Sequence, residues 1–199
     1  MATTPRRLPS ETAPDWPFGA LAPHSYGLIL ADPPWRFATR SAKRQTKLVP
    51  YATMRKGALL TLPVWRLAAP NCALAMWATQ AQLPDAVDLM KRWGFDYRTA
   101  GAWAKRSATD STWAFGTGYW LRSAAEFFLL GAYGEPTIRS RSERNLIVAP
   151  VRGHSRKPEA LHEALERMFP RVKKLELFAR QRREGWDGWG DEYPDEGGA

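Results

Sequence analysis

The residues Leu28-Ile29-Leu30-Ala31-Asp32-Pro33-Pro34-Trp35 form an apolar run that ends abruptly in an acid, two prolines and an indole. Proline lacks an N–H and fixes its own φ, so a β-strand cannot continue through two consecutive prolines. The run therefore predicts a buried strand over Tyr26–Ala31 with Asp32 at its carboxyl end. Open α/β sheets build their sites at the carboxyl ends of strands, so Asp32–Trp35 is the first candidate site.

Apolar runs and amphipathic stretches alternate along the rest of the chain. We expect strands over Cys72–Ala78, Tyr97–Lys105, Glu126–Tyr133, Leu146–Val151 and, as the last strand, Leu175–Ala179, with helices over Lys56–Leu67, Gln80–Trp93 and Pro158–Phe169. This alternation predicts one α/β, Rossmann-like domain over residues 23–192, with a mostly parallel sheet covered by helices on both faces. Residues 1–22 are expected to be an extended, partly ordered lead-in, and residues 193–199 a disordered tail.

The composition limits the classes of function. The chain has 199 residues, with 29 Lys and Arg against 20 Asp and Glu, which favours a polyanionic partner. Cys72 is the only cysteine, so neither an internal disulfide nor a Cys-rich zinc site can form. The three histidines are scattered, and we expect no metal. The sequence contains no signal pattern or long apolar span, which predicts a cytoplasmic protein with no membrane partner.

The positive charge is concentrated in loops. Eight basic residues and no acidic one lie between Pro33 and Pro84, and a second basic run covers Thr137–Lys157. A charge run is often only a solvated face, but the first run directly follows the candidate site. We therefore expect these loops, together with Arg106–Tyr119, to contact nucleic-acid phosphates. The predicted contacts are Arg36, Arg40, Lys43, Arg44, Lys47, Arg139 and Arg141.

The Asp-Pro-Pro-Trp motif is suited to activating an amine. The exocyclic amine of adenine is a poor nucleophile because its lone pair is delocalised into the ring. The Asp32 carboxylate could accept one amino hydrogen and the carbonyl of Pro33 the other, which would draw the nitrogen towards tetrahedral geometry. Trp35 offers a face on which an extruded base could stack. The alternative is a strand-ending acid, a turn and a core tryptophan.

Further blocks follow this motif in order from Tyr26 to Glu192. They are Pro50-Tyr51-Ala52-Thr53-Met54, Leu74-Ala75-Met76-Trp77-Ala78-Thr79, Trp93-Gly94-Phe95, Trp103-Ala104-Lys105, Thr117-Gly118-Tyr119-Trp120-Leu121, Ser155-Arg156-Lys157-Pro158-Glu159 and Lys174-Leu175-Glu176-Leu177-Phe178-Ala179-Arg180. Together the blocks resemble the MT-A70 (MTA-70-like) family of S-adenosylmethionine-dependent adenine-N6 methyltransferases. This resemblance implies a methyltransferase fold with permuted motif order, in which the catalytic strand comes first. The permutation would explain why no G-x-G-x-x-G fingerprint precedes the motif.

The resemblance also implies roles for individual residues. Catalysis would fall to Asp32, Pro33, Pro34 and Trp35. The implied contacts to S-adenosylmethionine are Asp32, Lys157, Arg180, Asp191 and Glu192, where Lys157 meets the methionine carboxylate and the last two acids accept from ribose hydroxyls. Tyr51 and Glu126 would lie at the acceptor base. Their alternatives are a loop-anchoring aromatic for Tyr51, a partner of an arginine for Glu126 and a solvated cation for Lys157.

The sequence leaves the nucleic acid and the assembly open. Bacterial and phage members of the family resemble DNA enzymes, and no RNA-binding module is visible here, so we expect DNA rather than RNA. A non-catalytic subunit that holds nucleic acid for a partner is the alternative to an enzyme. Because no target-recognition domain is visible, we also expect either relaxed specificity or a dimer, with a second copy or a second family member. After Arg180 the chain has Gln181-Arg182-Arg183, which departs from the family pattern.

Overall fold

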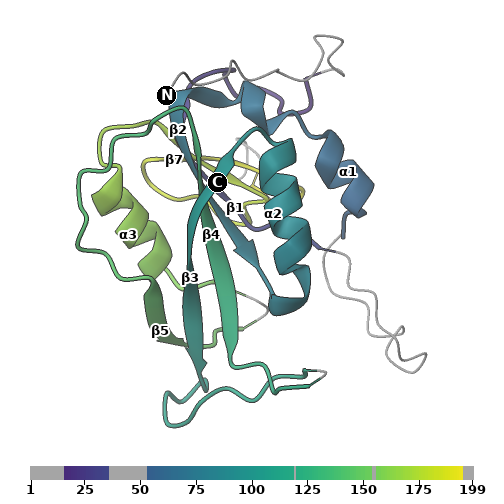
Figure 1. Ribbon diagram of the computed structural model, residues 1–199, viewed down its shortest axis with the longest axis vertical. Helices are drawn as coiled ribbons and strands as arrows, with labels where there is room; N and C mark the ends of the chain where they lie inside the picture. The colour runs from purple at the N-terminus through teal and green to yellow at the C-terminus, as the bar shows by residue number, and fades with distance from the viewer. Residues whose placement is uncertain (1–15, 36–52, 119, 154–155, 195–199) are drawn as a thin grey trace, which may run out of the picture.

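The computed structural model describes residues 16–35, 53–118, 120–153 and 156–194. These residues form a seven-stranded sheet in the order β5-β3-β4-β2-β1-β6-β7 (Figure 1). The strands are β1 (Tyr26–Ala31), β2 (Ala68–Ala78), β3 (Asp96–Arg106), β4 (Ala125–Tyr133), β5 (Leu146–Pro150), β6 (Lys174–Leu177) and β7 (Trp186–Trp189). The helices are α1 (Lys56–Thr61), α2 (Leu83–Arg92) and α3 (Ala160–Met168), with 3-10 turns η2 (Val64–Arg66) and η3 (Gln80–Gln82).

The sheet is mostly parallel, as the sequence predicts. Within the described residues, β4 alone runs against its neighbours: it pairs antiparallel with β2 and with β3, whereas the other four strand pairings are parallel. Strand β1 lies between β2 and β6, so the first and the sixth strands of the chain are hydrogen-bonded neighbours. The centre of the sheet therefore joins strands from distant parts of the chain.

Helices cover both faces of the sheet. This burial is needed because β1 has apolar side chains on both faces. Leu28 and Leu30 pack in one core cluster with Leu161 and Leu165 of α3. Ile29 and Ala31 belong to a second cluster, which contains the buried residues of α2. All six residues of β1 are buried, and a continuous apolar run without polar alternation is what a strand covered on both faces requires.

The structure corrects three predicted elements. The expected helix over Lys56–Leu67 is interrupted, because the residue before Pro63 is forced out of helical geometry and Leu62 is extended. Residues 80–82 are a 3-10 turn before α2 rather than part of one helix. The strand that ends at Leu177 is not the last one, since β7 follows and pairs with it.

Both flanking segments contribute to the packing within the described residues. Phe18 is fully buried, and its ring lies 5.2 Å from that of Trp189 in an edge-on contact. The N–H of Tyr193 donates to the carbonyl of Gly190 at 3.1 Å. Residues 1–15 of the predicted lead-in and residues 195–199 of the predicted tail lie outside the described residues.

Candidate active site

The Asp-Pro-Pro-Trp motif forms a tight turn at the carboxyl end of β1, as expected. The N–H of Trp35 donates to the carbonyl of Pro33 at 2.8 Å, and the N–H of Met54 donates to the carbonyl of Pro34 at 2.9 Å. The carbonyl of Pro33 therefore retains one lone pair for another donor. Trp35 is only 7% exposed and belongs to the core cluster, so it forms a wall of the site more than an open face.

Four charged side chains of alternating sign meet beside this turn, and we call them the charge chain: Asp32, Lys157, Glu126 and Lys105. The Nζ of Lys157 lies 2.7 Å from Oδ2 of Asp32 and 3.4 Å from Oε2 of Glu126, whose other oxygen binds the Nζ of Lys105. Each comes from a different element: the end of β1, the loop before α3, the start of β4 and the end of β3. The sequence motifs thus converge in space.

Burial and charge compete in the charge chain, and charge prevails. Burial alone would raise the pKa of the Glu126 carboxyl, but Lys157 and Lys105 outweigh it and hold that pKa below its ordinary value. Burial lowers the pKa of the Lys157 ammonium, but Asp32 and Glu126 more than offset it, so the pKa lies above its ordinary value. Both groups are therefore charged at neutral pH.

Three adjoining hollows open around the turn, and Asp32 and Arg180 line all three. The first, about 50 Å³, has Phe178, Ala179, Trp189, Asp191 and Glu192 in its wall. The second, about 70 Å³, is lined by Pro33, Pro34, Trp35, Trp77, Thr79, Glu126 and Lys157. The third, about 210 Å³, is lined by Gly153, Arg156, Glu159, His162, Glu176 and Gln181. The Asp32 carboxylate therefore lies where the three hollows meet.

The loops after β6 and β7 bring the carboxyl-terminal residues to Asp32. Phe178 has a φ of 62°, in the left-handed region, which turns the chain sharply after β6. The two loops approach so closely that a Cβ at Gly190 would stand 2.9 Å from the Cα of Phe178. Arg180 extends from the first loop to Glu192 in the second, with 3.5 Å between its Nε and Oε2.

Two residues that the sequence analysis did not select also line the third hollow, the largest of the three. The Nε2 of His162 lies 3.0 Å from Oε2 of Glu176, and the Nδ1 of His162 is buried without a partner among the described residues. The available signal was the sequence Lys174-Leu175-Glu176-Leu177, in which an acid interrupts an apolar strand. Its alternation places Glu176 on the face opposite the buried Leu175 and Leu177.

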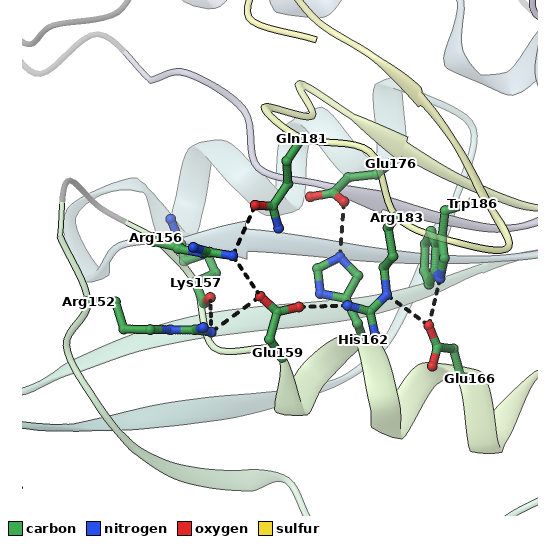
Figure 2. Close-up of polar contacts among 10 residues, drawn as sticks. All are labelled: Arg152, Arg156, Lys157, Glu159, His162, Glu166, Glu176, Gln181, Arg183 and Trp186. Atoms are coloured by element: carbon green, nitrogen blue, oxygen red, sulfur yellow. Dashed lines mark hydrogen bonds and ion pairs between the residues drawn. The ribbon is translucent and has the colours of Figure 1, made fainter. Parts of the chain in front are cut away.

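A second group of charged side chains, which we call the Arg–Glu network, ties the start of α3 to the loop between β6 and β7 (Figure 2). The carboxylate of Glu159 forms ion pairs with three arginines, with N–O distances of 2.6 Å to Arg183, 3.4 Å to Arg152 and 3.5 Å to Arg156. Arg183 also bonds Glu166, which accepts the indole N–H of Trp186 at 2.8 Å. Arg156 and Glu159 of this network line the third hollow.

The structure brings most of the predicted site residues together, but not the second basic loop. Asp32–Trp35, Glu126, Lys157, Arg180, Asp191 and Glu192 all line the three hollows. The predicted contacts Tyr51, Arg36, Arg40, Lys43, Arg44 and Lys47 lie outside the described residues.

Arg139 lies away from the three hollows. Its N–H donates to the carbonyl of Met168 at the end of α3, and it lines a separate cavity of about 190 Å³ beside Gly27, at the amino end of β1. The loop that carries Arg139 and Arg141 leaves the sheet at the end of β4, which is opposite the site because β4 is reversed. Neither arginine is among the residues that line the three hollows.

Comparison with known proteins identifies the family. The MT-A70 family model matches residues 26–192. The chain belongs to the MT-A70 family. It is 32% identical over 198 residues to the Type II methyltransferase M.MunI of a Mycoplasma species, covering 89% of this chain and 82% of that protein. The family and the methyltransferase class expected from the sequence are thereby confirmed.

Eukaryotic members share the same domain within longer proteins. The chain is 32% identical over 165 residues to the Arabidopsis thaliana N(6)-adenosine-methyltransferase MT-A70-like protein, covering 81% of this chain and 23% of that protein. It is 28% identical over 159 residues to the human N(6)-adenosine-methyltransferase catalytic subunit METTL3, covering 78% of this chain and 26% of that protein. The chain thus spans about a quarter of the length of these two relatives.

The residues around the three hollows fit the cofactor that this family implies, S-adenosylmethionine. The hollows offer a cation at Lys157 for a carboxylate, acids at Asp191 and Glu192 for hydroxyls, and a half-buried carboxylate at Asp32 for an ammonium. Within the described residues, no group of three or more His, Cys, Asp or Glu side chains could hold a metal ion. No helix there is long and apolar enough to cross a membrane.

Proposed function

We propose that this protein transfers a methyl group from S-adenosylmethionine to the 6-amino group of adenine in DNA. The observation that carries the proposal is the position of Asp32, whose carboxylate is shared by the acceptor hollow and by both neighbouring hollows. A group at this junction can touch an incoming base on one side and a cofactor on the other. Holding the two reactants in line makes the transfer effectively a unimolecular step, which lowers its barrier.

The turn supplies the acceptors for the amine. Among the described residues only Lys157 binds the Asp32 carboxylate, and it does so through Oδ2. Oδ1 is then available to accept one amino hydrogen, while the second lone pair of the Pro33 carbonyl accepts the other. The amine lone pair forms the new N–C bond as the methyl–sulfur bond breaks towards sulfur, and Asp32 is the nearest base for the proton that the nitrogen must lose.

The remaining residues orient the reactants. S-adenosylmethionine, when bound, supplies an electrophilic methyl group on a sulfonium. Lys157 would hold its carboxylate, and Arg180, Asp191 and Glu192 would hold its ribose side from the loops after β6 and β7. Trp35 and Trp77 wall the acceptor hollow and exclude water from the base. Tyr51 and the basic residues Arg36, Arg40, Lys43, Arg44 and Lys47 would guide the nucleic acid to this hollow.

DNA is proposed over RNA because of the length match. This chain covers 82% of M.MunI, which is named a Type II methyltransferase, but only about a quarter of the relatives named for adenosine. A compact enzyme of this kind would act in the cytoplasm of a bacterial or phage-infected cell. A homodimer, or a heterodimer with a second family member, remains compatible with the small size of the domain.

The direct test is transfer of labelled methyl to adenine-containing DNA and RNA of matched sequence. The Asp32→Ala variant should lose transfer by at least about a thousandfold, because one hydrogen-bond acceptor and the nearest base are both removed. Its affinity for the cofactor should stay within about tenfold of the wild type. Mapping methylated adenines in the DNA of cells that express the protein, beside the Asp32→Ala control, identifies the target.

Three results would contradict the proposal. Activity that survives Asp32→Ala would make the mechanism wrong. Faster transfer to RNA than to DNA would make the substrate wrong. Tight nucleic-acid binding with no transfer to either polymer would identify a non-catalytic binding subunit.

A further inference from the structure

The connection between β3 and β4 displays large apolar side chains to solvent. We call residues 107–124, apart from residue 119, the aromatic hairpin. Trp113 is 57% exposed, Phe115 80% and Trp120 90%, and Leu121 beside them is 78% exposed. Aromatic side chains that gather on one exposed segment mark an interaction site far more often than scattered single residues do. No residue of this hairpin lines the three hollows of the active site.

The aromatic hairpin has a defined backbone. The N–H of Ala114 donates to the carbonyl of Lys105 at 2.8 Å, and the N–H of Gly116 donates to the carbonyl of Ser123 at 2.9 Å. A Cβ at position 118 would stand 1.7 Å from the carbonyl oxygen of Leu121, so only glycine permits the chain to double back there. The rings are therefore held out on an ordered support rather than on a loose loop.

An arginine side chain lies over each of two of the rings. Arg106 lies over the ring of Trp113, 4.8 Å from its centroid, and Arg122 lies over Phe115 at 5.4 Å. A flat apolar ring with a positive charge beside it is complementary to a base with its neighbouring phosphate. A purely apolar partner would not require the arginines, and a second copy of this chain, with its formal net charge of +9, would bring like charge to this surface.

The aromatic hairpin also lies beside the active site. It leaves the sheet after Arg106, the residue that follows Lys105, and returns at Ala125, the residue before Glu126; Lys105 and Glu126 are adjacent members of the charge chain. Figure 1 shows the hairpin projecting beyond the end of the sheet to which β3 points. Because β3 runs parallel to β1 in the sheet, this is the end at which Asp32 lies.

We propose that the aromatic hairpin is a stacking platform for unpaired bases of a single-stranded segment of nucleic acid next to the adenine to be methylated. This inference rests on the proposed function, since it places the bound strand relative to the acceptor hollow. Stacking on aromatic rings tolerates any base, so the platform contributes affinity without reading sequence. It would hold the strand that is exposed when the target adenine leaves a duplex.

The test is equilibrium binding of a short fluorescein-labelled single-stranded DNA, followed by anisotropy, with no methyl donor present. Trp120→Ala and Phe115→Ala should each weaken binding by roughly tenfold, because each removes one stacking surface. The matched control is Tyr97→Ala, which removes an aromatic side chain that is 44% exposed at the opposite end of β3. The control should bind the strand as the wild type does, and all three variants should bind S-adenosylmethionine as the wild type does.

Two results would overturn the platform. In the first, both hairpin variants bind the strand as tightly as Tyr97→Ala does. In the second, the wild type sediments as a dimer that Trp120→Ala dissociates while strand affinity is unchanged, which would assign the hairpin to contact between copies. Failure of the proposed function has a different signature: hairpin variants that weaken strand binding in a protein without transfer activity would support the platform and reject the enzyme.

Discussion

The charge chain and the Arg–Glu network differ in burial and in redundancy. In the charge chain the four side chains are 13–27% exposed, and each inner member bridges two partners of opposite sign. In the Arg–Glu network the exposed fractions run from 22% to 51%, and three arginines share the single carboxylate of Glu159. Removing one member of the charge chain should therefore leave a buried charge without a partner. Removing one arginine of the Arg–Glu network should leave the carboxylate with its other partners.

Replacing Lys157 and, separately, its sequence neighbour Arg156 tests the difference between the charge chain and the Arg–Glu network. Lys157→Met leaves Asp32 and Glu126 facing each other without their shared cation, and we expect the free energy of unfolding to fall by about 3 kcal/mol. Methyl transfer should fall at least about a hundredfold. Urea unfolding at neutral pH and an assay with labelled cofactor measure the two effects.

The matched control is Arg156→Met, one position earlier in the chain. The Arg156 side chain is 51% exposed, and Glu159 keeps two other arginines without it, so the loss should be under about 1 kcal/mol. Equal losses of unfolding free energy at the two positions would break the distinction between the charge chain and the Arg–Glu network.

Glu126→Gln should change the response of stability to acid. The pKa of Glu126 is lowered by folding, so its stabilisation is present above the ordinary glutamate pKa and is lost as the pH falls through the lowered value. The wild type should therefore be more stable than the variant at neutral pH, and the difference should shrink as the pH falls through the lowered pKa of Glu126. A difference in unfolding free energy that does not vary with pH would show that Glu126 acts through packing rather than charge.

A smaller effect is expected within the Arg–Glu network. Arg183 bridges Glu159 and Glu166 across the start and the middle of α3, and its side chain is 22% exposed. Arg183→Met should cost about 1 kcal/mol of unfolding free energy, and Arg183→Met with Glu166→Gln should cost less than the sum of the single changes. Additive losses in this double-mutant cycle would mean that the two side chains do not interact.

We expect the smallest effect on stability at an exposed ion pair. Lys56 and Asp85 join α1 to α2, with side chains that are 46% and 45% exposed. Asp85→Asn should leave the midpoint of thermal unfolding unchanged within error, because solvent already screens the pair. A clear loss of thermal stability would show that exposure alone does not separate important from unimportant charges in this molecule.

The sequence was sufficient for the centre of the sheet and for the Asp-Pro-Pro-Trp turn. The apolar run before Asp32 predicts β1 because no polar residue interrupts it, and two prolines fix where it ends. Local patterns of this kind depend only on neighbouring residues. The gathering of Lys157, Arg180, Asp191 and Glu192 around Asp32 was implied by the family resemblance, since nothing in their spacing alone determines which strand becomes the neighbour of β1.

The sequence was insufficient wherever the outcome depends on distant packing. Strand β7, with the sequence Trp186-Asp187-Gly188-Trp189, has little strand propensity and exists because it pairs with β6 and because Asp187 accepts the hydroxyl of Tyr26. Arg139 was assigned to the site by charge alone, but the reversed direction of β4 places its loop at the far end of the sheet. Neither outcome is encoded in a local pattern.

The central position of β1 has a consequence for synthesis of the chain. On one side β1 pairs with β2, but its partner on the other side, β6, is translated only after β2 to β5 and α3. Until Lys174–Leu177 has left the ribosome, one edge of a wholly apolar strand presents unpaired N–H and C=O groups. Such an edge is a template for pairing with other chains, so the growing polypeptide depends on shielding until its last strands arrive.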